Sequence, residues 1–217
     1  MNKQILRLAD SISRRSFIGG SDARVIMGSD EAALIRLWQE KRGEAEPEDL
    51  SGNLVVQLGA VTEELNRSWY ERNTGRRVAD VQRQVKHSAI PWMAATLDGI
   101  VEGAHAVFEA KFMLPWSFSE ETAAEKYMAQ VQHNMWVTHL RTAALSIITG
   151  GGKWVEIEIA ADSLYQHLLV TGAPLPLRRR SATGPHRGGA HRRYELIQCL
   201  GGFLQRLQAD PRGLPRA

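Results

Sequence analysis

Three ionisable residues near the middle of the chain, Asp98, Glu109 and Lys111, have types and a spacing that could support metal-assisted chemistry. Glu109 and Lys111 are two residues apart, so on an extended strand both side chains lie on the same face. A hairpin between TLDG and FEAK would place Asp98 across from Glu109. Two neighbouring carboxylates favour a shared hard cation such as Mg²⁺, with Mn²⁺ as a substitute. A lysine beside that cation can orient or deprotonate a water, or stabilise charge on a phosphate.

The same residues are also compatible with an ordinary exposed strand. A Glu-x-Lys pattern is common on charge-compensated surfaces, and Asp-Gly is a common turn sequence. In this chain, however, Phe108 and Phe112 occupy the opposite face, and the flanking MAAT and AVF segments are apolar. Charged groups in such a central element are costly unless they are paired or bound to a metal. The pattern alone therefore leaves both interpretations open.

Two kinds of element must position these residues. Hydrophobic spacing predicts a short helix from Ser21, a second helix from about Asp30 to near Gly43, and a loop over residues 44–52. A third helix follows, in which spacings of three and four predict one buried stripe and Gly75 provides the C-terminal cap. The stripe consists of Leu58, Val61, Leu65 and Trp69.

The remaining elements alternate between strands and a helix. Residues 76–88 show a weak strand pattern, and the two strands MAATLDGIV and AVFEAKF are separated by a hairpin loop at 102–105. Residues 122–140 return to helical spacing, with Tyr127, Val131 and Met135 on one face. A second hairpin turns at the glycines 150–152. This order predicts an α+β, or mixed α/β, domain with antiparallel hairpins.

Four sequence blocks, in this order, resemble the YqaJ/lambda-exonuclease family of phage recombination nucleases, a branch of the PD-(D/E)xK superfamily. They are RRSFIGGSDA, LGAVTEELNRSWYERNTG, TLDG with FEAK, and YMAQVQHNMWVT, and together they cover roughly residues 14–165. A lone D…E-x-K pattern is weakly specific, whereas four ordered blocks are much more so. The chain departs from the family where it has Thr96-Leu97 before Asp-Gly, in place of the more frequent Ser-Pro.

The resemblance implies a restriction-endonuclease-like core, in which a central mixed sheet is flanked by helices, and a role for each matching residue. Asp98 and Glu109 correspond to the metal-binding carboxylates, with the Ala110 carbonyl and Glu63 completing the metal shell. Glu63 is chosen over Glu64 because it lies four residues after Gly59. Lys111 corresponds to the catalytic lysine. Two further matches are Gln130, at the active site, and the pair Arg14 and Ser21, which would bind a DNA end phosphate.

The implied activity is an Mg²⁺-dependent exonuclease that degrades linear duplex DNA from the 5′ end. Its implied partners are double-stranded DNA ends, a single-strand annealing protein and further copies of the chain in a homo-oligomer. Two alternatives remain open: an endonuclease of the same superfamily, and a DNA-end-binding protein with an impaired site. An endonuclease would cut circular DNA, whereas an exonuclease would cut only linear DNA. A DNA-end-binding protein with an impaired site would show no metal-dependent cleavage at all.

Composition and charge divide the chain near residue 170. The 217 residues carry a net charge of +3, but residues 171–217 hold nine Arg, one Glu and one Asp, a charge of +7. The first 170 residues therefore carry −4, so the basic character belongs to the tail. We predict a nuclease domain over 1–170 and an Arg/Gly/Pro-rich tail over 171–217, disordered except for a possible short helix at 194–208. The single cysteine and the absence of a long apolar run lead us to expect a cytoplasmic protein without a membrane segment.

Overall fold

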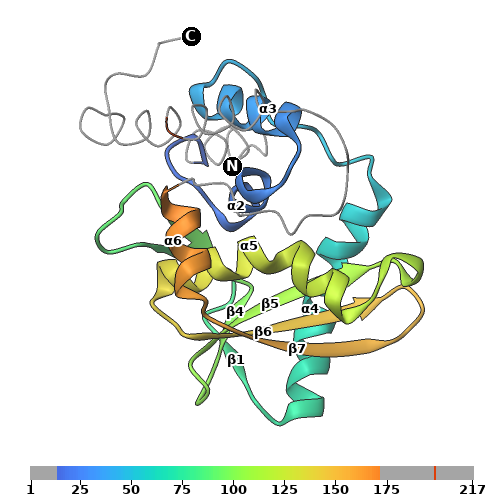
Figure 1. Cartoon of the computed structure of the whole chain (residues 1–217). Helices are drawn as coiled ribbons and strands as arrows, with labels where there is room; N and C mark the ends of the chain where they lie inside the picture. Colours follow the sequence, from blue (N-terminus) through green and yellow to red (C-terminus); the bar gives the residue numbers. More distant parts are fainter. Residues whose placement is uncertain (1–13, 172–197, 199–217) are drawn as a thin grey trace, which may run out of the picture.

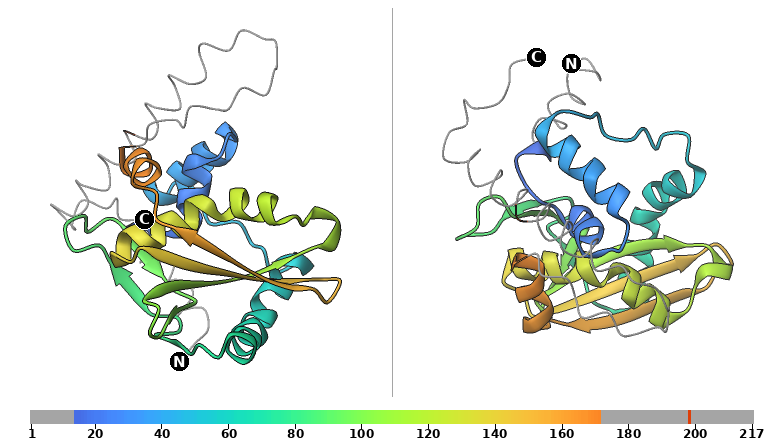
Figure 2. Two further views of the ribbon diagram at one scale, coloured as in Figure 1. Left: turned by 60° about the horizontal axis from the view of Figure 1, so that its bottom comes forward. Right: turned by 45° about the horizontal axis from the view of Figure 1, so that its top comes forward.

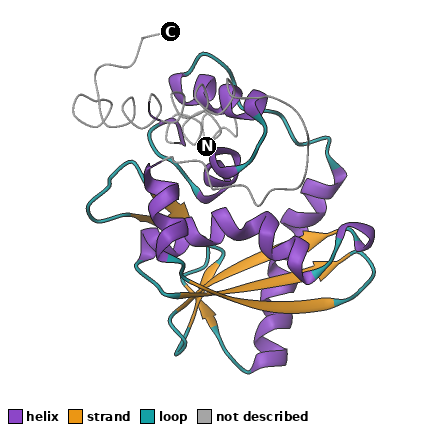
Figure 3. Cartoon of the chain, viewed as in Figure 1, coloured by secondary structure: helices purple, strands orange, loops and turns teal. Residues whose placement is uncertain are grey.

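A five-stranded mixed sheet with a helix packed on each face forms the centre of the structure (Figures 1 and 3). The computed structural model describes residues 14–171 together with Gln198. In spatial order the strands are β1 (Val78–Ala79), β4 (Gly99–Val101), β5 (Ala106–Met113), β6 (Thr142–Thr149) and β7 (Trp154–Ala160). β5 and β6 pair in parallel, and the other neighbours are antiparallel. This arrangement confirms the predicted mixed α/β core.

Helix α5 (Glu120–Thr138) is the crossover that the parallel β5–β6 pair requires. Its first turn is capped by Ser119, whose side chain accepts a hydrogen bond from the Thr122 amide. Tyr127, Val131 and Met135 are buried against the sheet, as their spacing predicted. The left view of Figure 2 shows α5 lying along one face of the sheet, with α4 (Leu54–Thr74) on the other. The predicted second hairpin is confirmed as β6 and β7.

The segment MAATLDGIV is divided between two sheets, where the sequence predicted one strand. Its first part is β3 (Ala94–Thr96), which pairs with β2 (Gln84–Lys86) in a separate two-stranded sheet. Its second part is β4, which pairs with β5 through the predicted loop at 102–105. A Cβ atom on Gly99 would lie 2.2 Å from a methyl group of Val78, so the close approach of β1 requires glycine here. Asp98 lies where the two strands diverge.

The predicted buried stripe of helix α4 (Leu54–Thr74) is wrong, although its C-terminal cap at Gly75 is confirmed. Val61 is 71% exposed and Leu65 is 52% exposed. The face that packs on the sheet carries instead Asn66 and Tyr70, which are four residues apart. The Tyr70 ring packs on Phe108 at 5.0 Å, while Asn66 bonds to the main chain of the sheet. Periodicity identified the helix but not the side that faces the protein.

Of two N-terminal helices, the first packs on α5 and the second packs on the first. These are α2 (Gly20–Met27) and α3 (Glu31–Arg42), and both agree with the predicted segments. Asp30 caps α3 at its start, and Gly43 ends it with a φ of 75°. Ahead of α2, Ile18 forms a bridge with Met93, which ties the N-terminal segment to the strand end before β3. None of the helices in the described residues is both long enough and apolar enough to span a membrane.

The last described helix is α6 (Ser163–Thr171), and it is followed by the segment predicted as a tail. The disorder predicted for 172–193 and the helix predicted for 194–208 lie outside the described residues, with the exception of Gln198. The side-chain amide of Gln198 donates to the Thr171 carbonyl at 2.7 Å. A short 3-10 turn, η1 (Pro115–Ser117), joins β5 to α5.

The contacts of Asn66 predict a large effect of its substitution on stability. Asn66 is 1% exposed, and its amide donates to the carbonyls of Lys111 and Ser146 and accepts from the Ser146 hydroxyl. Asn66→Leu would remove all three hydrogen bonds from a buried position, so we expect a loss of about 2–4 kcal/mol in the free energy of unfolding. Urea denaturation measures this loss in the free energy of unfolding. Asn73→Ala, on the exposed end of the same helix, is the control and should cost far less.

Candidate active site

Asp98 and Glu109 are brought together at the point where β4 leaves β5. The last register pair is Gly99 with Phe108, so beyond it the main chain of β5 is free of β4. One carboxylate oxygen of Asp98 (Oδ2) accepts a hydrogen bond from the Ala110 amide at 2.9 Å and replaces the missing strand partner. On an extended strand the N–H and C=O of one residue point to the same side. The Ala110 carbonyl therefore faces the side of β5 on which Asp98 lies.

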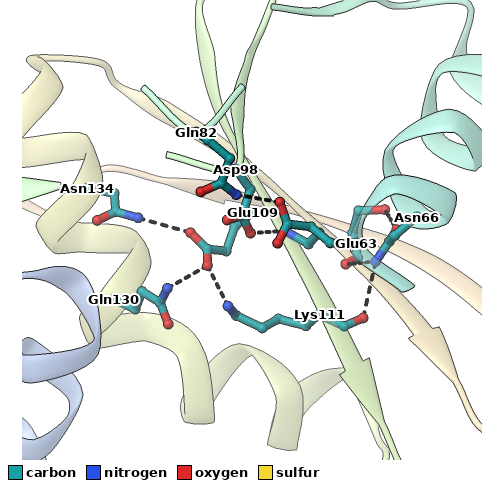
Figure 4. Close-up of polar contacts among 10 residues, drawn as sticks. Glu63, Asn66, Gln82, Asp98, Glu109, Lys111, Gln130 and Asn134 are labelled. Atoms are coloured by element: carbon teal, nitrogen blue, oxygen red, sulfur yellow. Dashed lines mark hydrogen bonds and ion pairs between the residues drawn. The ribbon is translucent and has the colours of Figure 1, made fainter. Parts of the chain in front are cut away.

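The carboxylate of Glu109 is 1% exposed and is held by three donors (Figure 4). Its Oε1 atom accepts from the Lys111 ammonium and from the Gln130 amide, each at 2.5 Å. Its Oε2 atom accepts from the amide of Asn134 at 2.9 Å. A buried carboxylate is tolerable only when its charge is compensated in this way. Strand β5 and helix α5 together supply that compensation.

The two carboxylates affect each other electrostatically. Burial, followed by the negative charge of Glu109, raises the pKa of Asp98 to about 7. Burial also raises the pKa of Glu63, with the charge of Asp98 as the next contribution. This shift places the Glu63 carboxylate within electrostatic range of Asp98. The site therefore concentrates negative charge in a place where water cannot fully screen it, which is the condition that a cation relieves.

Lys111 is fixed in place by charge and by an aromatic ring. Burial disfavours its ammonium form, but the charges of Glu109 and Asp98 outweigh that effect and raise its pKa. Its Nζ atom also lies 5.3 Å from the centre of the Tyr127 ring. The lysine is therefore a cation beside the two acids.

Among the residues that the sequence predicted as metal ligands, Glu63 has the weakest structural link to the pair Asp98 and Glu109. Its carboxylate accepts a hydrogen bond from the Gln82 side chain at 2.5 Å. Within the described part of the chain, no three His, Cys, Asp or Glu side chains gather closely enough to hold a metal ion. Asp98 and Glu109 are thus the central pair, and the role of Glu63 as a metal ligand stays a prediction.

The predicted phosphate-binding residues lie together at the start of α2. The guanidinium of Arg14 donates to the Ser21 hydroxyl at 3.4 Å. The buried ammonium of Lys41 holds this turn by donating to the carbonyls of Arg14 and Phe17 and to the Asp22 carboxylate. Asp22 in turn accepts from the Gly19 amide at 2.8 Å. The exposed side chains of Arg14 and Ser21 are therefore presented from a firmly anchored turn.

Asn134 is a site residue that sequence reasoning missed. It lies one helical turn after Gln130, and both amides reach Glu109. A spacing of four residues places two side chains on the same face of a helix, so the spacing could have revealed it. Gln82 and Asn66 were also missed, and their positions depend on loop and helix packing that no local pattern encodes.

The donor set fits a hard divalent cation such as Mg²⁺. Carboxylate and carbonyl oxygens are the ligands that Mg²⁺ prefers, and this ion usually retains several waters beside one or two protein carboxylates. Asp98, Glu109 and the Ala110 carbonyl supply such a set. With Lys111 adjacent, the site has what hydrolysis of a phosphodiester requires: places for a cation, for a water and for a compensating positive charge.

Comparisons with known proteins concern the family and the fold of the chain. The chain is 29% identical over 167 residues to the uncharacterized protein YqaJ of Bacillus subtilis strain 168, and it spans about half the length of that relative (52%). Its fold is similar to that of an alkaline exonuclease from Laribacter hongkongensis, with a TM-score of 0.61 and 16% identity over 92% of this chain and 95% of the other.

A phage-related exonuclease from Haemophilus somnus 129PT is also similar, with a TM-score of 0.59 and 12% identity over 88% of this chain and 96% of the other. These two likenesses concern the fold. In sequence, residues 12–141 match the YqaJ-like viral recombinase domain. Because this match spans more than half of the 217 residues, the chain belongs to the YqaJ-like viral recombinase domain family.

Proposed function

We propose that this protein is a metal-dependent deoxyribonuclease that degrades linear duplex DNA from the 5′ end. The observation that carries the proposal is the buried pair Asp98 and Glu109 with Lys111 beside it. Family membership and the exonuclease-like fold support the same function. The endonuclease alternative uses the same centre but needs no DNA end, and the impaired-site alternative conflicts with the presence of both carboxylates and the lysine.

In the proposed reaction, Asp98, Glu109 and the Ala110 carbonyl would hold an Mg²⁺ ion, with Glu63 of α4 as a further ligand. When bound, the ion supplies Lewis-acid polarisation of the phosphate and makes a water more acidic. Lys111 orients the attacking water and stabilises the negative charge that develops on the phosphate. Gln130 keeps Glu109 directed toward Asp98. Mn²⁺ satisfies the same oxygen donors and is proposed as a substitute.

The direction of attack rests on the turn that carries Arg14 and Ser21. A terminal phosphate monoester has more charge and more free oxygens than an internal diester, and a guanidinium binds it through charge-assisted hydrogen bonds. Helix α2 packs on α5, the helix that supplies Gln130 and Asn134 to Glu109. The proposed phosphate-binding turn is therefore next to the helix that lines the metal centre. This position favours an enzyme that acts at a DNA end.

Degradation from the 5′ end would leave a 3′-ended single strand. A single-strand annealing protein is therefore the proposed partner, since it would bind the product as it forms. A homo-oligomer is likewise proposed.

Removal of either central carboxylate should abolish cleavage. We expect Asp98→Asn and Glu109→Gln each to lower the rate at least about a thousandfold, because each removes a hard ligand that the other cannot replace. The assay is digestion of end-labelled linear duplex with Mg²⁺. Glu158→Gln, an exposed residue on β7, is the control. Retention of most of the wild-type rate in either variant would show that the metal site lies elsewhere.

Asp98→Asn should stabilise the metal-free protein in a pH-dependent way. The folded pKa of Asp98 is about 7, above the unfolded value of roughly 3.9, so its contribution to stability is largest below about pH 4 and is lost as the pH rises toward 7. Asparagine keeps the acceptor for the Ala110 amide without the charge. We therefore expect a gain of about 1–3 kcal/mol near pH 8, and less near pH 5.

Urea denaturation in EDTA at the two pH values measures this gain. Asp80→Asn is the control, because Asp80 is exposed and its φ of 53° suits asparagine. An equal gain at both pH values would contradict the charge-repulsion account of the site.

A 5′-phosphate should accelerate digestion, and Arg14 should account for the difference. A charge-assisted contact of about 1.5–3 kcal/mol corresponds to roughly a tenfold to hundredfold preference over the dephosphorylated duplex. We expect Arg14→Ala to remove this preference and covalently closed circles to resist digestion. Arg15→Ala is the matched control, because Arg15 is paired with Glu46 at 2.9 Å. Cleavage of circles at the linear rate would favour the endonuclease alternative.

A further inference from the structure

The first residue of α2, Gly20, lies against the two amides that hold Glu109. A Cβ atom at this position would come within 2.6 Å of the Asn134 side-chain oxygen (Oδ1) and 2.9 Å of the Gln130 Cγ atom. Both distances are shorter than a Cβ atom tolerates, so one of the helices or amides would have to move. The contact involves Asn134 and Gln130, the same two residues whose amides donate to Glu109.

Asn134 is held differently at its two ends. The residue is 1% exposed, and its Nδ2 atom donates to Glu109 Oε2 at 2.9 Å. Its Oδ1 atom is buried and has no hydrogen-bond partner within the described part of the chain. A buried amide that bonds at one end only is costly, so packing must contribute to its orientation. Gly20 provides that packing.

The two oxygens of Glu109 are also held unequally. Oε1 accepts from two of the named donors, Lys111 and Gln130, and Oε2 accepts from the Asn134 amide. Figure 4 shows Gln130 and Asn134 pointing from α5 toward this carboxylate. Without Asn134 the carboxylate plane could turn about its last torsion, and its alignment with Asp98 would change.

We propose that Asn134 is a positioning residue for the metal-holding carboxylate of Glu109, and that Gly20 is required because any side chain there would displace Asn134 and Gln130. This inference rests on the proposed function, since it concerns the same metal centre. It adds a mechanical link: the turn that carries Ser21 and the centre that contains Glu109 are in contact through Gly20. Residues that orient a metal ligand without touching the metal commonly change metal affinity about tenfold to hundredfold.

The experiment compares Gly20→Ala with Gly19→Ala. A Cβ atom on Gly19 meets its nearest neighbours, Asp22 and Phe17, only at 3.6 Å, which is ordinary contact, so it is a matched control in the same turn. Two measurements are made on each protein: the thermal shift produced by Mg²⁺ without DNA, and the Mg²⁺ concentration for half-maximal cleavage. We expect Gly20→Ala to need about tenfold more Mg²⁺ in both, with the KM for DNA unchanged and Gly19→Ala like the wild type.

Two substitutions of Asn134 guard against a folding defect. Asn134→Leu should show the same loss of Mg²⁺ response as Gly20→Ala. Serine is shorter than asparagine, so it leaves room for a Cβ atom at position 20, and it has a hydroxyl donor in place of the amide. The double variant Gly20→Ala/Asn134→Ser should therefore need less Mg²⁺ than Gly20→Ala alone. A role in packing alone would lower the melting temperature of the metal-free variants and leave the Mg²⁺ requirement unchanged, and that result would overturn the inference.

The outcomes for the inference and for the proposed function differ. If the wild type shows neither an Mg²⁺-induced thermal shift nor cleavage, the proposed function fails and the inference fails with it. If the wild type shows both and Asn134→Leu shows both at the same Mg²⁺ concentrations, the inference alone fails.

Discussion

The buried carboxylate of Glu109 is the group on which the arrangement of the site depends. A charge at 1% exposure needs compensation from nearby donors, and these come from two separate elements: Lys111 on the same strand, and Gln130 and Asn134 on α5. Helix α5 must therefore have a defined position over the sheet and a defined rotation about its own axis. Its apolar residues Tyr127, Val131 and Met135 supply the packing that holds it there. Burial of apolar surface stabilises the helix, while the charge selects its position.

The N-terminal helices depend on a second buried charge. Lys41 is 4% exposed, and it donates to Asp22 and to the carbonyls of Arg14 and Phe17. This arrangement joins α3 to the turn before α2 and supplies a donor to two carbonyls of that turn. The turn is then close enough to α5 for Gly20 to touch Asn134 and Gln130. The proposed phosphate-binding turn and the metal centre are thus connected by one continuous set of contacts.

On the opposite face of the sheet, α4 is held by polar contacts as well as by apolar packing. Asn66 bridges β5 and β6, and the Ser146 hydroxyl receives a further hydrogen bond from the Trp154 ring nitrogen. The apolar residues of the exposed side, such as Val61 and Leu65, contribute nothing to this contact. The same helix brings Glu63 into electrostatic range of Asp98. Its orientation therefore serves the site at the expense of apolar burial.

The sequence by itself determined the elements whose cause is local. Asp30 and Gly43 mark the ends of α3, the loop at 102–105 sets the β4–β5 hairpin, and the alternation along β5 places Glu109 and Lys111 on one face. These features follow from capping, turn geometry and strand periodicity, which act over a few residues. The placement of Asp98 near Glu109 was predictable for the same reason, whereas the central mixed sheet was expected from the family resemblance, because the parallel β5–β6 pair joins segments that are far apart in the chain.

Only the tertiary structure decided the features that depend on contacts between distant segments. The inward face of α4 was misjudged because Asn66 is buried by hydrogen bonds to strands that lie 45 and 80 residues away in the chain. The division of MAATLDGIV into β3 and β4 depends on β2 and β1, which pair with its two halves. Asn134 acquired its place from Glu109 and Gly20 together. Hydrophobic periodicity records how apolar a face is, but the partner that a face meets, and the charge that the partner must neutralise, exist only once the chain has folded.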